Sequence, residues 1–127
     1  MWVEDFEGGL DITTPHALEA ALTKRYGDGR NSFWLARQAG KFPAINIMVR
    51  GELAYVHYFP VERHAGFASV AKVPGPRPDG TSIFFLYPTE KVWAPNRALI
   101  PFSEALKAAQ EFAISNSMPI GIKWFEL

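Results

Sequence analysis

Two alternating runs between residues 43 and 59, joined by Gly51-Glu52, constrain the fold more than any other feature of this sequence. A two-residue loop that begins with Gly favours a type II′ hairpin turn, and such a turn pairs Arg50 with Leu53. One face of the hairpin is then wholly apolar: Ile45, Ile47, Val49, Ala54, Val56 and Tyr58. The other face mixes polar and aromatic side chains: Ala44, Asn46, Met48, Arg50, Leu53, Tyr55, His57 and Phe59. The hairpin therefore belongs to a sheet with one face on a core, and function is to be sought on the second face.

The length and composition indicate one globular domain that spans residues 1–127. Hydrophobic residues make up 48% of the chain and charged residues 20%, a balance typical of globular proteins. A chain of this length buries roughly two thirds of its unfolded surface, so it needs no metal or disulfide to fold. It has no run of about 18 apolar residues that could span a membrane, and its first residues do not resemble a signal peptide. We therefore expect a cytoplasmic protein with no membrane partner.

The absence of cysteine and the balance of charge exclude several kinds of function. With no cysteine in the chain, disulfides, thiol nucleophiles and cysteine-ligated zinc are all ruled out. Thirteen basic residues balance thirteen acidic ones, so no overall field steers the protein onto a polyanion. Strand aromatics are then better explained by core packing than by base stacking, and direct nucleic-acid binding is not expected.

The rest of the chain predicts two helices and several further strands. Thr14 can cap a helix that begins at Pro15 and continues to about Tyr26, and a second amphipathic helix is expected from about Pro101 to Asn116. Further strands are expected over residues 6–13, 32–38, 64–73, 81–87, 91–100 with a break at Pro95-Asn96, and 120–127. Residues 74–80 contain three prolines and two glycines and are expected to form an exposed loop. The predicted fold class is α+β: a mostly antiparallel sheet of about six to eight strands with two helices packed on it.

No pattern in the chain indicates catalysis, a cofactor or a metal. A nucleophile elbow, a P-loop and a dinucleotide fingerprint are all absent. His57, Glu62 and His64 are the closest grouping of metal-ligand types, but their spacing matches no helical zinc motif. We interpret His57 instead as half-buried and paired with the amide of Asn46. A small ligand-binding domain or enzyme with a pocket near His57 and Asn46 is kept as an alternative, and so is a homodimer that pairs exposed sheet edges.

Partner binding is the function that the residue types support best. Arginine, tyrosine, tryptophan and histidine on loops or on a mixed sheet face are typical of protein interfaces. Three segments offer them: the second face of the hairpin, the proline-rich loop and the interrupted strand. The candidate partner-binding residues are Tyr55, His57, Glu62, Arg63, Arg77, Asp79, Glu90 and Trp93.

Three segments together resemble a known family: the hairpin from Pro43-Ala44-Ile45-Asn46-Ile47 to Ala54-Tyr55-Val56-His57-Tyr58, the run Ala108-Ala109-Gln110-Glu111-Phe112, and Pro119 followed by Trp124-Phe125-Glu126-Leu127. Their order and spacing, together with the chain length, resemble the deaminase-associated immunity protein family, the first numbered immunity family of bacterial polymorphic toxin systems. Residues 60–98 match this family least.

The resemblance implies an α+β protein that is encoded beside a toxin and neutralises it by direct binding, without catalysis or a cofactor. The toxin in such pairs often carries a nucleic-acid deaminase domain. On this hypothesis the acidic Glu62, Asp79 and Glu90 would occupy a basic cleft of the toxin, and the other candidate residues would anchor the contact. The chain itself cannot be a zinc deaminase, because it lacks the cysteine ligands. Residues 60–98 are the natural place for contacts specific to one toxin.

Overall fold

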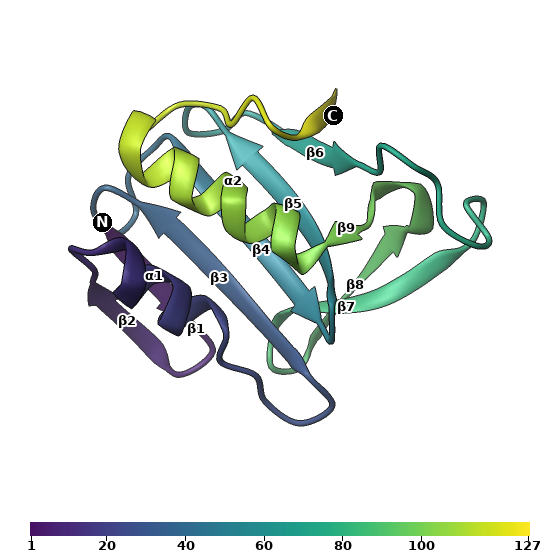
Figure 1. The fold of residues 1–127 in the computed structure, drawn as a ribbon, viewed down its shortest axis with the longest axis horizontal. Coiled ribbons are helices and arrows are strands. Elements are labelled where there is room, and N and C mark those ends of the chain that lie inside the picture. The colour runs from purple at the N-terminus through teal and green to yellow at the C-terminus, as the bar shows by residue number, and fades with distance from the viewer.

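The computed structural model describes residues 1–127 and contains two antiparallel sheets and two α-helices (Figure 1). The strands are β1 (Trp2–Asp5), β2 (Gly8–Asp11), β3 (Arg30–Ala36), β4 (Ala44–Arg50), β5 (Leu53–Phe59), β6 (Phe67–Val70), β7 (Thr81–Tyr87), β8 (Glu90–Pro95), β9 (Ile100–Pro101) and β10 (Lys123–Glu126). The helices are α1 (Pro15–Leu22) and α2 (Phe102–Ser115), with a short 3-10 turn η1 (Asn96–Ala98). The main sheet has eight strands in the order β10-β6-β5-β4-β3-β1-β2, with β9 beside β5, and β7 pairs only with β8. The predicted α+β class is confirmed.

The central hairpin is formed as the sequence predicts. β4 and β5 pair from Arg50 opposite Leu53 to Ala44 opposite Phe59 without a register shift. Gly51 has a positive φ of +61° and Glu52 has a negative φ, which is the combination found in a type II′ turn. The turn chemistry therefore sets which side chains face which side of the sheet.

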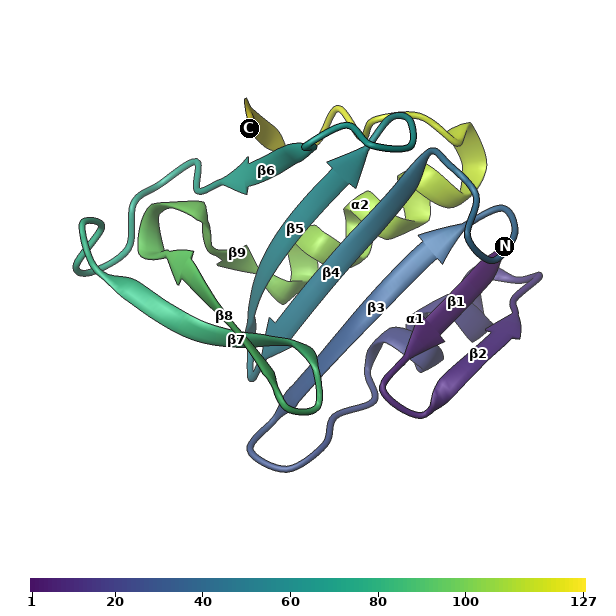
Figure 2. The same ribbon diagram turned by 180° about the vertical axis from the view of Figure 1, so that it is seen from behind.

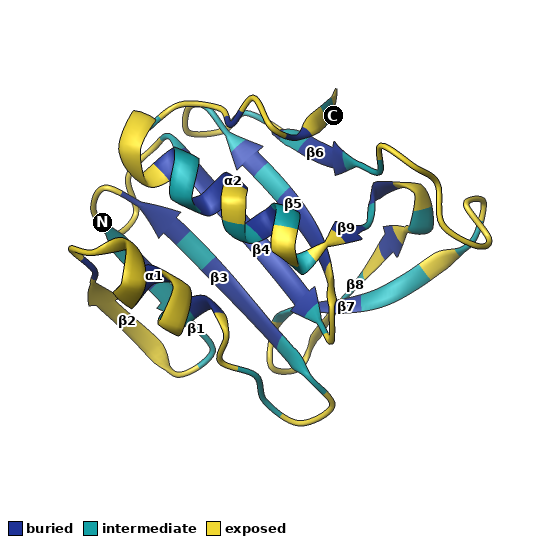
Figure 3. Ribbon diagram, viewed as in Figure 1, coloured by how far each residue is buried: buried dark blue, intermediate teal, exposed yellow.

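Both helices cover the apolar face of the sheet (Figure 1). All six predicted residues of that face belong to a core cluster of 18 buried residues, to which α1 contributes Leu18 and Leu22. The ring of Phe112, from α2, lies edge-on to Tyr58 at 6.3 Å between centroids. Figure 3 shows the central strands as buried and the outer sides of both helices as exposed. This core fixes the sheet as a rigid platform for the residues on its other side.

The β7–β8 hairpin crosses the second face of the sheet, which is the face opposite the helices (Figure 2). A smaller core lies beneath it, formed by Met48, Tyr55, Ala68, Phe84, Ala94 and Ala98. Arg50 holds the hairpin at one end, since its guanidinium donates to the carbonyl of Ile83 at 2.9 Å and to Asp28 at 2.7 Å. Arg30 also binds Asp28 at 2.7 Å and lies 3.8 Å from the ring centre of Phe85.

The prediction of one strand over residues 6–13 is wrong. The chain instead forms a hairpin of β1 and β2, with Phe6 and Glu7 at its turn. Val3 of β1 is buried in the main core, whereas every residue of β2 is exposed at the sheet edge. The side chain of Asp5 stabilises the turn, because its carboxylate accepts hydrogen bonds from Glu7 N and from the hydroxyl of Tyr26. Two four-residue strands with acidic residues leave too weak an alternation to be recognised from sequence.

Several other predicted boundaries also shift. The first helix ends at Leu22, not Tyr26, because Tyr26 pairs with Arg30 and so begins the approach to β3. The strand predicted over 64–73 is reduced to β6, since the N–H of Ala71 donates to the carbonyl of Arg97 at 2.8 Å and leaves the ladder. The break predicted at Pro95-Asn96 is confirmed by η1, and β7 and α2 lie within one residue of their predicted bounds.

Candidate functional site

The structure separates the two candidate residues of the central hairpin. Tyr55 lies beneath the β7–β8 hairpin with 8% of its surface exposed, and burial raises the pKa of its hydroxyl. His57 is half-buried beside it, with 4.4 Å between the two ring centres, and its ring stacks on Phe59 at 6.0 Å. Burial lowers the pKa of His57 to about 4. His57 is thus neutral near pH 7 and acts as an aromatic packing group on this face.

The interpretation that His57 pairs with Asn46 by a hydrogen bond is wrong. The two residues lie opposite each other in the register of β4 and β5, but the amide of Asn46 donates to Ser32 Oγ at 3.0 Å and to the carbonyl of Phe33 at 3.2 Å. Its Oδ1 atom is buried without a hydrogen-bond partner. The amide therefore ties β4 to β3, and no polar pair converges on a pocket here.

The remaining candidate residues occupy exposed loops and the outer hairpin. Glu62 and Arg63 lie in the turn between β5 and β6. Arg77 and Asp79 lie in the loop before β7, where Asp79 binds Arg97 at 3.2 Å. Glu90 begins β8, and the Trp93 side chain on the same strand is 63% exposed. These residues do not meet in one site, and their binding role stays a prediction.

A groove that the sequence did not reveal lies on the second face beyond the β7–β8 hairpin. It is a hollow of about 240 Å³ between β1, β3, the β3–β4 loop and the end of β7. Four aromatic side chains line it together with smaller residues and two charged ones: Trp2, Glu4, Trp34, Leu35, Ala36, Gly40, Lys41, Phe42, Ala44 and Tyr87. We call this hollow the aromatic groove. Trp34 could be placed on a strand from the sequence, but no pattern showed that the end of β7 stops short of covering it.

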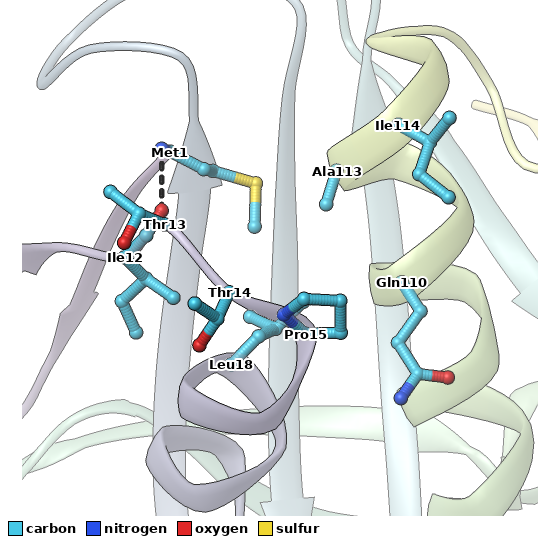
Figure 4. Close-up of a pocket in the computed structure, with 9 residues that line it drawn as sticks. All are labelled: Met1, Ile12, Thr13, Thr14, Pro15, Leu18, Gln110, Ala113 and Ile114. Carbon is cyan, nitrogen blue, oxygen red and sulfur yellow. Dashed lines mark hydrogen bonds between the residues drawn. The ribbon is translucent and has the colours of Figure 1, made fainter.

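A wider hollow of about 680 Å³ lies on the helix side of the sheet, between the start of α1 and the end of α2 (Figure 4). Its walls are mostly apolar, and Ile114 at its rim is 86% exposed. The hydroxyl of Thr14 in this hollow is used as the helix cap, accepting from Ala17 N at 3.1 Å. No aspartate, glutamate, histidine, lysine or arginine side chain lines it. Neither this hollow nor the aromatic groove is lined by His57 or Asn46.

The structure shows neither a cluster of metal-ligand side chains nor a helix that could span a membrane. No group of three or more histidine, aspartate or glutamate side chains is placed to hold a metal ion. None of the helices has the length and apolar character needed to cross a membrane.

Comparison with known proteins supplies the remaining observation. No family model matches the chain. The chain is 24% identical over 128 residues to a double-stranded DNA deaminase immunity protein of Burkholderia cenocepacia (strain H111), and the alignment covers 100% of both proteins. The chain resembles a deaminase immunity protein over its whole length. The family resemblance predicted from the hairpin, the second helix and the terminal strand is thereby confirmed.

Proposed function

We propose that this protein is an immunity protein that neutralises a deaminase toxin by binding it directly and occluding its active site. The observation that carries the proposal is the similarity over the full length of both chains to a protein named as a deaminase immunity protein. The architecture agrees with a binding role, since a rigid sheet backed by helices presents exposed loops and a groove. No aspartate, glutamate, histidine, lysine or arginine lines the wider hollow, and of these residue types the aromatic groove has only Glu4 and Lys41. On this proposal the protein acts in the cytoplasm of the toxin-producing bacterium and needs no cofactor.

The test uses the deaminase domain encoded beside the gene for this protein. Cells that express the active deaminase domain should survive only when they also express this protein, and the two purified proteins should elute together on gel filtration. Survival that does not depend on this protein, or the absence of a complex, would contradict the proposal.

A titration distinguishes binding from enzymatic inactivation of the toxin. Deamination of a DNA or RNA substrate is measured while this protein is added to a fixed amount of the deaminase domain. Direct occlusion predicts that activity falls in proportion and reaches its minimum near equal amounts of the two proteins. Complete loss of activity at a small fraction of one equivalent would show that this protein modifies the toxin catalytically.

A further inference from the structure

Four carboxylates gather at the edge of the sheet next to the aromatic groove. Residues 1–15 contain Glu4, Asp5, Glu7 and Asp11 but neither lysine nor arginine. All four lie on the β1–β2 hairpin or at its turn, and none of them has a basic side chain within 4.0 Å. A group of acidic side chains without ion-pair partners, on a hairpin whose outer strand is exposed, produces a local negative field in a chain whose net charge is zero.

The strand register places two of these carboxylates on the same face as the groove. Glu4 lies opposite Trp34 of β3, and Asp11 lies opposite Trp2 of β1. Since side chains of directly paired residues share a face, the second face carries carboxylates and indole rings side by side at this edge. β2, whose four residues are all exposed, is the edge strand of the sheet on this side (Figure 3).

The wall of the groove is held in place by close packing within the hairpin. The indole of Trp2 lies so near Gly9 that a Cβ atom there would come within 2.2 Å of the ring, so only glycine permits this contact. The indole N–H donates to Glu4 Oε1 at 3.2 Å, which orients the carboxylate beside the ring. On the inner side, Trp34 stacks on Phe59 with 5.6 Å between ring centres. The groove is therefore preformed, which lowers the entropic cost of binding.

The chemistry of the groove suits a cationic side chain. Aromatic faces bind a guanidinium or ammonium group, and an adjacent carboxylate adds an ion pair that arginine can form through two N–H groups. Phe42 and Tyr87 are 41% and 50% exposed at the rim, so rings are available on that side as well. The hollow of about 240 Å³ is small for a free ligand, since such pockets usually measure about 300 Å³ or more, but it accommodates an inserted side chain. Lys41 is the one basic residue in its wall.

We propose that the aromatic groove and the acidic β1–β2 hairpin enter the substrate cleft of the deaminase, where carboxylates take the place of phosphates and the groove receives an arginine side chain of the toxin. This inference rests on the proposed function. A deaminase that acts on a nucleic acid needs a cleft rich in lysine and arginine, and that cleft is complementary in charge to this edge of the sheet. The loops that hold Glu62, Asp79 and Glu90 are then peripheral.

The experiment measures the affinity for a catalytically inactive deaminase domain, encoded beside this gene, by isothermal titration calorimetry. Charge reversal in Glu4→Lys should weaken binding at least ~30-fold, and truncation in Tyr87→Ala at least ~10-fold. The matched control is Glu19→Lys, which reverses an exposed carboxylate on α1, on the opposite side of the sheet from the groove, and should change the affinity less than about threefold. Thermal melts of each variant show whether it folds, and Tyr87→Ala, at an exposed rim position, supplies a test should Glu4→Lys unfold.

A second readout follows competition for the nucleic acid. A fluorescent DNA duplex bound to the inactive deaminase domain should be displaced by the wild-type protein and poorly displaced by Glu4→Lys. The inference is overturned, while the proposed function stands, if both groove variants keep the wild-type affinity or if Glu19→Lys loses as much affinity as they do. A ternary complex with the duplex also overturns it. If the wild-type protein is a dimer and the groove variants are monomers, the groove binds a second copy of this chain and the inference is overturned. If the wild type does not bind the deaminase at all, the proposed function itself is contradicted.

Discussion

Acidification should destabilise this protein through His57, and the size of the effect can be worked out from the structure. The side chain is packed between Tyr55 and Phe59, and burial lowers its pKa from 6.5 to about 4. In the unfolded chain the imidazole takes up its proton near the ordinary pKa, so between these two values the unfolded state binds more protons than the native state. The free energy of unfolding therefore decreases as the pH falls through 6.5, and the loss is complete only below about pH 4.

The linkage relation gives a loss of about 2 kcal/mol between about pH 7 and pH 5 from this one group. His57→Phe keeps an aromatic ring between Tyr55 and Phe59 but cannot be protonated, so this variant should lack that part of the dependence. Urea titrations followed by tryptophan fluorescence at the two pH values measure it. His16→Gln is the matched control, because His16 is exposed on the first turn of α1 and its replacement should leave the wild-type dependence unchanged. Equal pH dependence in the wild type and in His57→Phe would refute the reasoning.

Two further predictions concern the packing of the sheet. Phe112→Ala should lower the free energy of unfolding by about 3–5 kcal/mol, because this residue is 1% exposed and its ring packs against Tyr58. Ile114→Ala, on the exposed side of the same helix, is the control and should change the free energy of unfolding by less than about 0.5 kcal/mol. Urea titrations of both variants measure the difference. Ser69→Ala should cost about 1–3 kcal/mol, because the hydroxyl accepts from Val56 N and donates to the carbonyl of Ala98, both in the interior. A thermal melt of Ser69→Ala that coincides with the wild type would show that water replaces these bonds.

The parts of the fold that depend on local chemistry were predictable. Gly51 and Glu52 specify the hairpin turn, and with the turn fixed the alternation of apolar residues sets the register of seven residue pairs. Thr14 and Pro15 mark the start of α1 in the same way, and the hydroxyl of Thr14 does cap the helix. Each of these features is decided by residues within a few positions of one another.

The packing of one element on another could not be predicted from the sequence. Tyr55 and Trp34 both lie on the second face, but β7 and β8 bury Tyr55 and leave Trp34 at the wall of a groove. Periodicity shows the side of a strand on which a residue lies, and it does not show what packs there. For the same reason His57 could be placed beside Asn46, whereas the hydrogen bonds from Asn46 to Ser32 and Phe33 depend on the neighbouring strand. The candidate site thus emerged from the tertiary arrangement.

The attachment of the β7–β8 hairpin has a consequence for how such a protein can change over generations. The two strands form a sheet of their own, so no backbone hydrogen-bond ladder joins them to the main sheet, and side chains such as Arg50 and Phe84 make the attachment. Insertions in residues 71–80 or at the tip of the hairpin can therefore alter its length or tilt without shifting the register of any central strand. The hairpin also reaches the groove through Tyr87. A lineage could thus change one wall of the groove while the central strands keep their register.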